Sequence, residues 1–119
     1  MKEPPLQLAA ILGFSGVALG AFGAHGLRTI LEQHGMSAVW QTAVLYHLVH
    51  AVAVLSAGAW RPWAARLWAA GILIFSGSLY ILAVSGVRWL GAITPIGGVL
   101  LLAGWIALVL PPRLFSRSG

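Results

Sequence analysis

The sequence predicts an all-α membrane protein with four transmembrane helices in a bundle, and three observations lead to this prediction. Of its 119 residues, 60% are hydrophobic and only 8% are charged, whereas a soluble domain carries about 25% charged residues. The mean hydropathy is +0.92. Four apolar windows each reach the length of about 20 residues that a bilayer requires. This composition excludes an ordinary soluble enzyme, a disordered chain and a nucleic-acid-binding module.

The four windows leave only short connections between them. They cover residues 6–27, 38–58, 67–86 and 90–110. No separate extramembrane domain fits in the remaining residues, so we expect residues 1–119 to form one membrane domain. The lipid bilayer is then the first partner, and any function lies within or beside it.

The connections predict how the chain is oriented. Segment 28–37 is polar enough for a short interfacial helix closed by Gly35. Arg28 and Arg88 fall in the first and third connections, whereas five basic residues fall at the two ends and in the second connection. Because cytoplasmic segments carry the excess of Lys and Arg, both ends are predicted to be cytoplasmic. The five are Lys2, Arg61, Arg66, Arg113 and Arg117.

The net charge of +5 does not indicate a nucleic-acid partner. The seven Lys and Arg residues are scattered between apolar windows and form no basic patch, which is typical of charges that set membrane topology. The sequence contains no cysteine, so neither a disulfide nor a thiolate is available for chemistry.

Small residues predict where helices pack closely. A stripe with spacings of 4, 3, 4 and 3 places five of them on one face of the first helix. Lipid drives helix association only weakly, so close backbone contact between small residues is needed. We favour a partner helix in the same chain, although a second copy of the chain is also compatible. The predicted packing residues are Ala9, Gly13, Gly16, Gly20, Gly23, Gly71, Gly97 and Gly104.

Polar residues within the apolar windows predict a pocket. His47 and His50 share one face of the second helix, and an ionisable side chain at that depth is costly unless it faces protein or water. In the predicted orientation most of the polar side chains fall in the outer half of the bundle, so the pocket opens outward and is closed on the inner side. Its predicted members are His25, Tyr46, His47, His50, Ser76, Ser78, Tyr80 and Thr94.

The histidines have three possible uses, which the sequence leaves open. They can tie helices together as neutral imidazoles, bind a proton or a small solute, or ligate a metal or haem with His25 as a third ligand. No carboxylate or thiolate within the windows completes a ligand set, so we expect no metal and no cofactor. Thr94 followed by Pro95 also predicts a helix N-cap.

Four blocks of the sequence, in chain order, resemble the signature of the domain-of-unknown-function 423 family, which includes transmembrane protein 256 and its bacterial relatives. They are residues 20–27 (GAFGAHGL), 40–50 (WQTAVLYHLVH), 75–80 (FSGSLY) and 90–98 (LGAITPIGG). The resemblance implies a small multi-pass protein of the bacterial inner (plasma) membrane. It implies no reaction.

These observations favour a non-enzymatic binding or accessory subunit with an outward-facing polar pocket and no catalytic residues. One alternative is an oligomeric transporter or proton-linked channel, since four short spans give little room for a solute path through one copy. A second alternative is a metal- or haem-binding membrane enzyme. A homo-oligomer and a larger membrane complex both fit the small-residue stripe, and the sequence does not identify a ligand.

Overall fold

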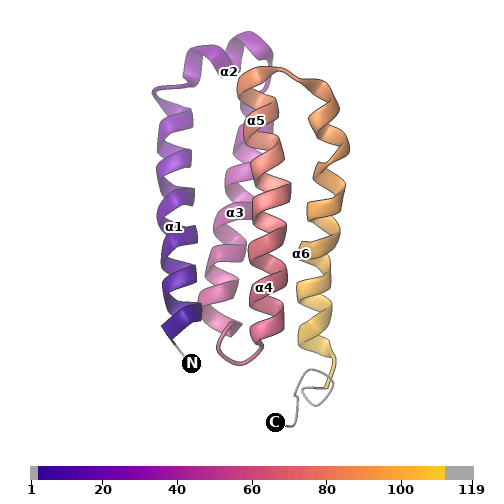
Figure 1. Ribbon diagram of the computed structural model, residues 1–119. Coiled ribbons are helices and arrows are strands. Elements are labelled where there is room, and N and C mark those ends of the chain that lie inside the picture. Colours follow the sequence, from indigo (N-terminus) through magenta and orange to yellow (C-terminus); the bar gives the residue numbers. More distant parts are fainter. Residues whose placement is uncertain (1–2, 112–119) are drawn as a thin grey trace.

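The computed structural model describes the backbone of residues 3–111 and the side chains of residues 6–111. Within this part the chain is helical and contains no strand (Figure 1). These residues form six α-helices, one π-helical turn, η1, between α4 and α5, and one 3₁₀ turn, η2, between α5 and α6. In chain order the elements are α1 (Glu3–Ala24), α2 (Arg28–His34), α3 (Ser37–Ala57), α4 (Pro62–Gly71), η1 (Ile72–Ser76), α5 (Gly77–Ser85), η2 (Arg88–Ala92) and α6 (Thr94–Val109).

Four continuous helical stretches are long and apolar enough to cross a membrane: Leu6–Ala24, Ser37–Ala57, Pro62–Ser85 and Arg88–Val109. The prediction of an all-helical chain with four apolar helices is therefore confirmed. The third stretch begins at Pro62 rather than at residue 67, because proline is well tolerated in the first turn of a helix.

The charged Arg66 is accommodated near the start of the third stretch, in its second turn. Its side chain is exposed, and its guanidinium lies 5.1 Å from the centroid of the Trp63 ring. An arginine near a helix end can extend toward the polar boundary while its stem covers apolar surface.

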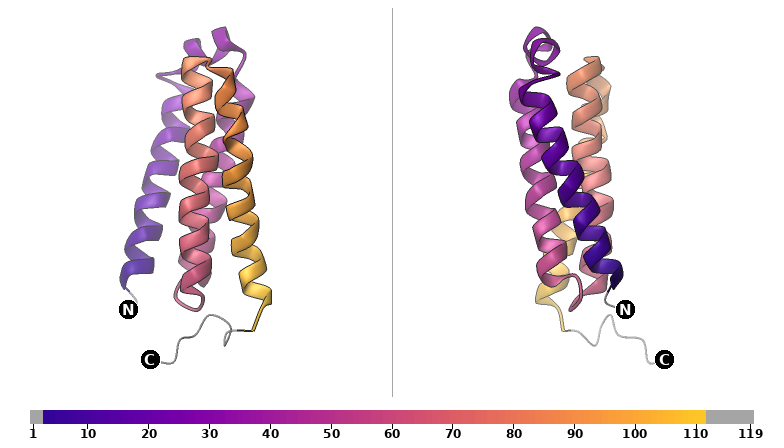
Figure 2. Two further views of the ribbon diagram at one scale, coloured as in Figure 1. Left: turned by 45° about the vertical axis from the view of Figure 1, so that its right-hand side comes forward. Right: turned by 90° about the vertical axis from the view of Figure 1, so that its left-hand side faces the viewer.

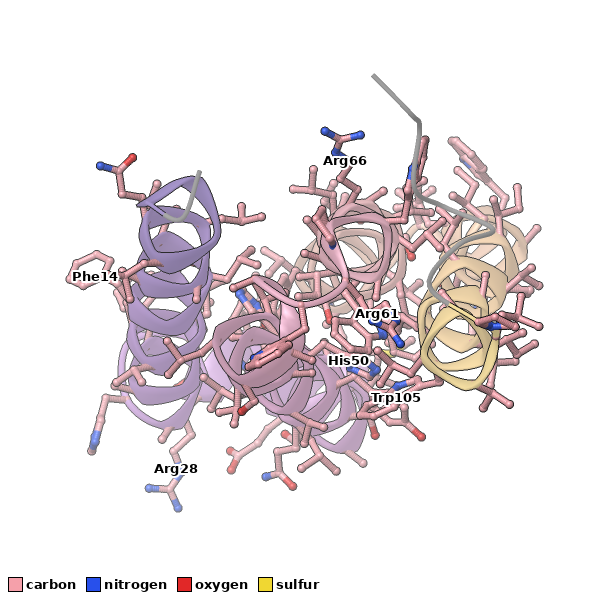
Figure 3. The ribbon with its side chains drawn as sticks, turned by 90° about the horizontal axis from the view of Figure 1, so that it is seen from below. Phe14, Arg28, His50, Arg61, Arg66 and Trp105 are labelled. Carbon is pink, nitrogen blue, oxygen red and sulfur yellow. The ribbon has the colours of Figure 1, made fainter. Side chains whose placement is uncertain are left out.

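The helices form a flattened bundle of 53 × 26 × 18 Å. The central helix α3 packs against α1 on one side and against α4, η1 and α5 on the other, while α6 packs against α4 and η1. As a result α1 and α6 lie at opposite edges (Figures 1 and 3). Both edge helices are covered mainly on one side, so much of their surface is open to the surroundings.

The start of α1, the α3–α4 connection and the end of α6 lie at one end of the bundle, and α2 lies at the other (Figures 1 and 2). The short helix α2 ends at Gly35, whose φ of 67° is in the left-handed region that glycine adopts without strain. The Nδ1–H of His34 donates to the carbonyl of Ala83 at 3.0 Å. This bond, together with the buried Leu31, holds α2 against α5.

The interior has two apolar clusters with polar side chains between them. The larger cluster includes Leu12, Val54 and Trp68, and the smaller one near α2 includes Leu31 and Trp40. The polar side chains between the clusters come from α1, α3 and the third helical stretch, Pro62–Ser85, which we call the third span. We call this set the central polar layer; its members are Ser15, His47, His50, Ser76 and Tyr80.

The small residues of α1 face α3 of the same chain. A Cβ added at Gly16 would lie 2.6 Å from the Leu48 side chain, and one added at Gly20 would lie 3.2 Å from Val44. At Gly23 it would overlap the Trp40 indole. Gly13 differs, because a Cβ there would meet nothing within 4 Å.

The other predicted small residues lie between the third span and α6. A Cβ at Gly104 would overlap the Trp68 indole, and one at Gly71 would lie 2.6 Å from Leu101. Gly97 faces the backbone of Phe75 in the π-helical turn η1. The wider turn of a π-helix displaces the local backbone from the ideal α-helical position.

Candidate functional site

The central polar layer lies midway along α3, about 15 Å from either end of that helix at 1.5 Å per residue. His47 is buried there and bonds to two other helices. Its Nδ1 lies 2.8 Å from the Tyr80 hydroxyl on α5, and its Nε2 lies 3.1 Å from the Ser15 hydroxyl on α1. The Ser15 hydroxyl also lies 3.1 Å from the carbonyl oxygen of Leu12.

For a neutral imidazole, these contacts fix the tautomer of His47. A carbonyl can only accept, so Ser15 uses its single hydroxyl hydrogen to donate to Leu12. The Nε2–H of His47 then donates to the Ser15 oxygen, and the Tyr80 hydroxyl donates to Nδ1 of His47. The result is a continuous chain of hydrogen bonds from α5 through α3 to α1 that uses both nitrogens of the imidazole.

His50 has the opposite tautomer. The Nε1–H of Trp105 on α6 donates to Nε2 of His50 at 2.9 Å, and an indole nitrogen can only donate. The proton of His50 is therefore on Nδ1, which donates to the carbonyl of Tyr46 at 2.8 Å. The ring also packs against Trp68, with centroids 6.3 Å apart. His50 thus joins α3 to α6.

The hydroxyl groups of the third span bond locally or to neighbouring helices. Ser76 is fully buried and donates to the carbonyl of Ala43 on α3 at 2.7 Å. Ser78 donates to the carbonyl of Phe75 at 3.0 Å, so the 2.6 Å contact between Ser78 and Thr94 is a donation from Thr94. These bonds stabilise the packing of the third span against α3 and α6.

The prediction that Thr94 caps a helix was wrong. Thr94 is itself the first residue of α6, and its side chain makes no capping hydrogen bond. The preceding residues form the turn η2, which supplies the carbonyl of Leu90 as a second acceptor for Thr94 at 3.5 Å. The Ser78 hydroxyl oxygen is much closer, so Thr94 donates its single hydroxyl hydrogen to Ser78, and the carbonyl oxygen of Leu90 is at most a weak secondary contact.

Two of the eight predicted pocket residues lie apart from the others or take part only through their backbone. His25 is exposed at the end of the bundle near α2. Tyr46 contributes its carbonyl to His50, while its ring is 42% exposed and packs beside Phe75 at a centroid distance of 4.9 Å. In the described part of the chain, no three side chains of the metal-binding types gather together. The six remaining residues lie in or next to the central polar layer.

A groove of about 610 Å³ opens elsewhere, between α1, α2 and α3. We call it the α2 groove. Arg28 and Glu32 of α2 form its charged rim, with Arg28 Nε 3.4 Å from Glu32 Oε2 and both side chains exposed. Its remaining walls are polar near α2 and apolar further along. They are formed by Gly20, Gly23, Ala24, Leu31, Ser37, Trp40, Gln41, Val44, Leu45 and Leu48.

Sequence reasoning missed this groove and two partners of the histidines. Ser15 and Trp105 are isolated polar residues within apolar windows. The usable signal was chemical, because an indole N–H or a hydroxyl in a membrane span requires an acceptor. For the groove, the signal was the pair Arg28 and Glu32, four residues apart beside the small residues that end α1.

Comparison with known proteins gives a consistent result. The sequence model described as "Protein of unknown function (DUF423)" matches residues 19–98. A UPF0382 membrane protein of Haemophilus influenzae is 49% identical, with 91% of this chain and 92% of the relative covered. The UPF0382 membrane protein YwdK of Bacillus subtilis is 44% identical, with coverage of 86% and 89%.

A third relative, the UPF0382 inner membrane protein YgdD of Escherichia coli, is 39% identical, with 96% of this chain and 92% of the relative covered. No solved structure matches the chain. The match therefore rests on sequence, and it extends over nearly the whole length of each relative. The chain belongs to the DUF423 (UPF0382) family of small membrane proteins, whose function is not known.

Proposed function

We propose that the protein is a non-enzymatic binding or accessory subunit of the bacterial plasma membrane. Both ends are cytoplasmic in this proposal, and α2 lies at the outer surface. The central polar layer ties the four spans together, and the α2 groove is the binding surface.

The hydrogen bonding of the central polar layer carries the proposal. Both nitrogens of His47 and both nitrogens of His50 are already engaged, in opposite neutral tautomers. A general base needs a free lone pair near a nucleophile, and a metal ligand needs a nitrogen directed at the ion. Hydrogen bonds between helices are instead the usual stabilising role of polar side chains in a membrane bundle.

The distribution of charge supports the orientation. The α3–α4 connection with Arg61, and the early part of α4 with Arg66, lie at the same end of the bundle as the start of α1 and the end of α6. The opposite end has Arg28 and Arg88 in its connections. Counted with the basic residues of the two chain ends, the sequence has five positive residues on one side and two on the other, and the larger number is expected to face the cytoplasm.

The orientation can be tested with single cysteines, because the natural sequence has none. Thr29 in α2 and Ala59 in the α3–α4 connection are both exposed. A membrane-impermeant maleimide added to intact cells should label the Thr29→Cys variant. The Ala59→Cys variant should be labelled only after permeabilisation. The reverse pattern would overturn the orientation.

The role can be tested by reconstitution and purification. We expect proteoliposomes to show no flux of protons or small solutes above that of empty vesicles. A flux that His47→Ala abolishes would favour the transporter alternative. A stoichiometric metal or a haem absorption band in the purified protein would favour the enzyme alternative. A bound molecule or partner subunit retained in mild detergent, and lost when the α2 groove is filled, supports the proposed role.

A further inference from the structure

The α2 groove combines charges of both signs with an apolar wall. Arg28 and Glu32 lie side by side at its rim, and Val44, Leu45 and Leu48 of α3 continue from it. Its volume of about 610 Å³ is within the range of about 300–1,000 Å³ that is usual for small-molecule sites. An amphiphile with a charged head and an apolar tail matches this arrangement.

The length of the groove agrees with that of a lipid tail. From Ser37 to Leu48 the lining residues of α3 span about 16 Å at 1.5 Å per residue. One leaflet of the hydrocarbon core is about 15 Å deep, half of about 30 Å. The groove therefore runs from the level of α2 to the middle of α3, where the central polar layer begins. Its α1 wall consists of the small residues Gly20, Gly23 and Ala24.

The rim favours a zwitterionic head over an anionic one. The contact with Glu32 uses the Nε–H of Arg28, while a guanidinium has five N–H donors in all. A phosphate can therefore bind Arg28 without breaking the ion pair. The carboxylate of Glu32 repels a head that carries only negative charge and attracts an ammonium group placed beside the phosphate.

The rim also favours a primary ammonium over a quaternary one. A primary ammonium donates hydrogen bonds to a carboxylate, whereas a quaternary ammonium has no N–H and is usually recognised by exposed aromatic faces. The aromatic residue that lines the groove is Trp40, which is 4% exposed and packs against Gly23 and Tyr80. Its ring is therefore buried in the interior and offers no exposed face to a quaternary ammonium.

We propose that the α2 groove binds one phospholipid with an ethanolamine head from the leaflet next to α2. The phosphate binds Arg28, the ammonium binds Glu32, and one acyl chain lies along Val44, Leu45 and Leu48. This inference rests on the proposed binding role and gives that role a ligand class. The topology and flux experiments above do not depend on it, so either can fail without the other.

The test is native mass spectrometry of the full-length protein in detergent, titrated with phosphatidylethanolamine, phosphatidylglycerol and phosphatidylcholine of identical acyl chains. We expect half-saturation with the ethanolamine lipid at a concentration at least about fivefold lower than with the other two. Free phosphoethanolamine should not displace the lipid, because it lacks the chain. Equal binding of all three lipids, or displacement by the free head group, overturns the proposal.

Variants of the rim and the groove locate the binding. Arg28→Ala and Glu32→Ala should each weaken binding of the ethanolamine lipid at least about fivefold. Arg88→Ala is the matched control, since Arg88 is exposed near the same end of the bundle and should leave binding unchanged. Tighter binding of phosphatidylglycerol by wild type, increased further by Glu32→Ala, would indicate an anionic-lipid site and contradict the proposal.

The acyl-chain contact needs its own variant. Ala24 lines the groove and is exposed, so Ala24→Phe fills the space without changing the ion pair. We expect this variant to lose the lipid while its unfolding midpoint in detergent stays within the error of the wild type. Retention of the lipid by a folded Ala24→Phe variant would show that the chain binds elsewhere.

Discussion

The two edge helices are held by similar contacts that differ in one bond. On one side Trp40 of α3 packs against Gly23 of α1, and on the other Trp68 of α4 packs against Gly104 of α6. The Trp40 indole N–H donates to the Leu19 carbonyl at 2.9 Å, whereas the buried Trp68 indole nitrogen has no partner among the described residues. Both edge helices are therefore held by an indole ring packed against a glycine. Only the contact between α1 and α3 adds a hydrogen bond from the indole nitrogen.

The two helix contacts also differ in what they leave open. On the α1 side, a groove with a charged rim opens between α1, α2 and α3. A smaller groove of about 310 Å³ lies between α3, α4 and α6, and none of its lining residues is charged. In addition, Gly97 of α6 lies directly against the backbone of Phe75. The α6 side is therefore mainly a packing surface, and the α1 side combines packing with a polar opening.

The largest expected effect comes from closing the tightest contact on the α6 side. In Gly97→Ala the new Cβ would overlap the backbone of Phe75, which cannot rotate away as a side chain can. We expect a loss of about 2–3 kcal/mol of stability, typical of overpacking, measured by unfolding in mixed detergent micelles. Gly13→Ala is the control on α1, where the Cβ has open space. Equal losses in the two variants would show that the contact of Gly97 with the Phe75 backbone is not the cause of the loss.

The second prediction isolates the indole hydrogen bond. Trp40→Phe and Trp68→Phe remove similar volumes, but only the first breaks a hydrogen bond. We expect Trp40→Phe to cost about 1 kcal/mol more than Trp68→Phe, the usual net value of one such bond. The same unfolding measurement provides the comparison. If Trp68→Phe proves the more costly variant, its indole nitrogen has a partner.

The third prediction concerns the bonds that connect the two sides. Tyr80→Phe removes the donor to Nδ1 of His47 and interrupts the chain that reaches Ser15 on α1. We expect a loss of about 1 kcal/mol, near the upper part of the range for hydrogen bonds between membrane helices. Tyr46→Phe is matched, because the Tyr46 contact to His50 uses the backbone carbonyl. A similar loss in both variants would assign the effect to ring packing rather than to the bond.

Much of the fold follows directly from the sequence, because long apolar windows have few alternatives in a bilayer. Gly35 ended α2 as expected from its place after a short polar helix. The π-helical turn Ile72–Ser76 was not predictable, since it contains no proline and depends on how Phe75 meets Gly97 of another helix. The pattern of apolar residues therefore predicts where the helices lie. It does not predict the π-helical turn, which lies where two helices meet.

The candidate site could be predicted only in part, for a similar reason. His47 and His50 were identified because an ionisable side chain in a span stands out. Their partners Ser15 and Trp105 come from α1 and α6, and only the packing of those helices shows which nitrogen each one reaches. The α2 groove depends on how α1, α2 and α3 pack together, and no pattern within one of these helices reports that packing.

The smallest expected effect on stability comes from the rim of the α2 groove. Arg28 and Glu32 are exposed and four residues apart on one helix, and such pairs contribute about 0.3–0.5 kcal/mol, less at high salt. In lipid-free detergent, Arg28→Ala should therefore change stability by less than about 0.5 kcal/mol. Gly23→Ala, whose Cβ would overlap the Trp40 indole, should cost clearly more in the same unfolding experiment. If Arg28→Ala destabilises the protein as much as Gly23→Ala, the rim belongs to the packing between α1 and α3. If it does not, the charged rim is free to serve a ligand, and the packing and binding contributions of the α1 side are separable.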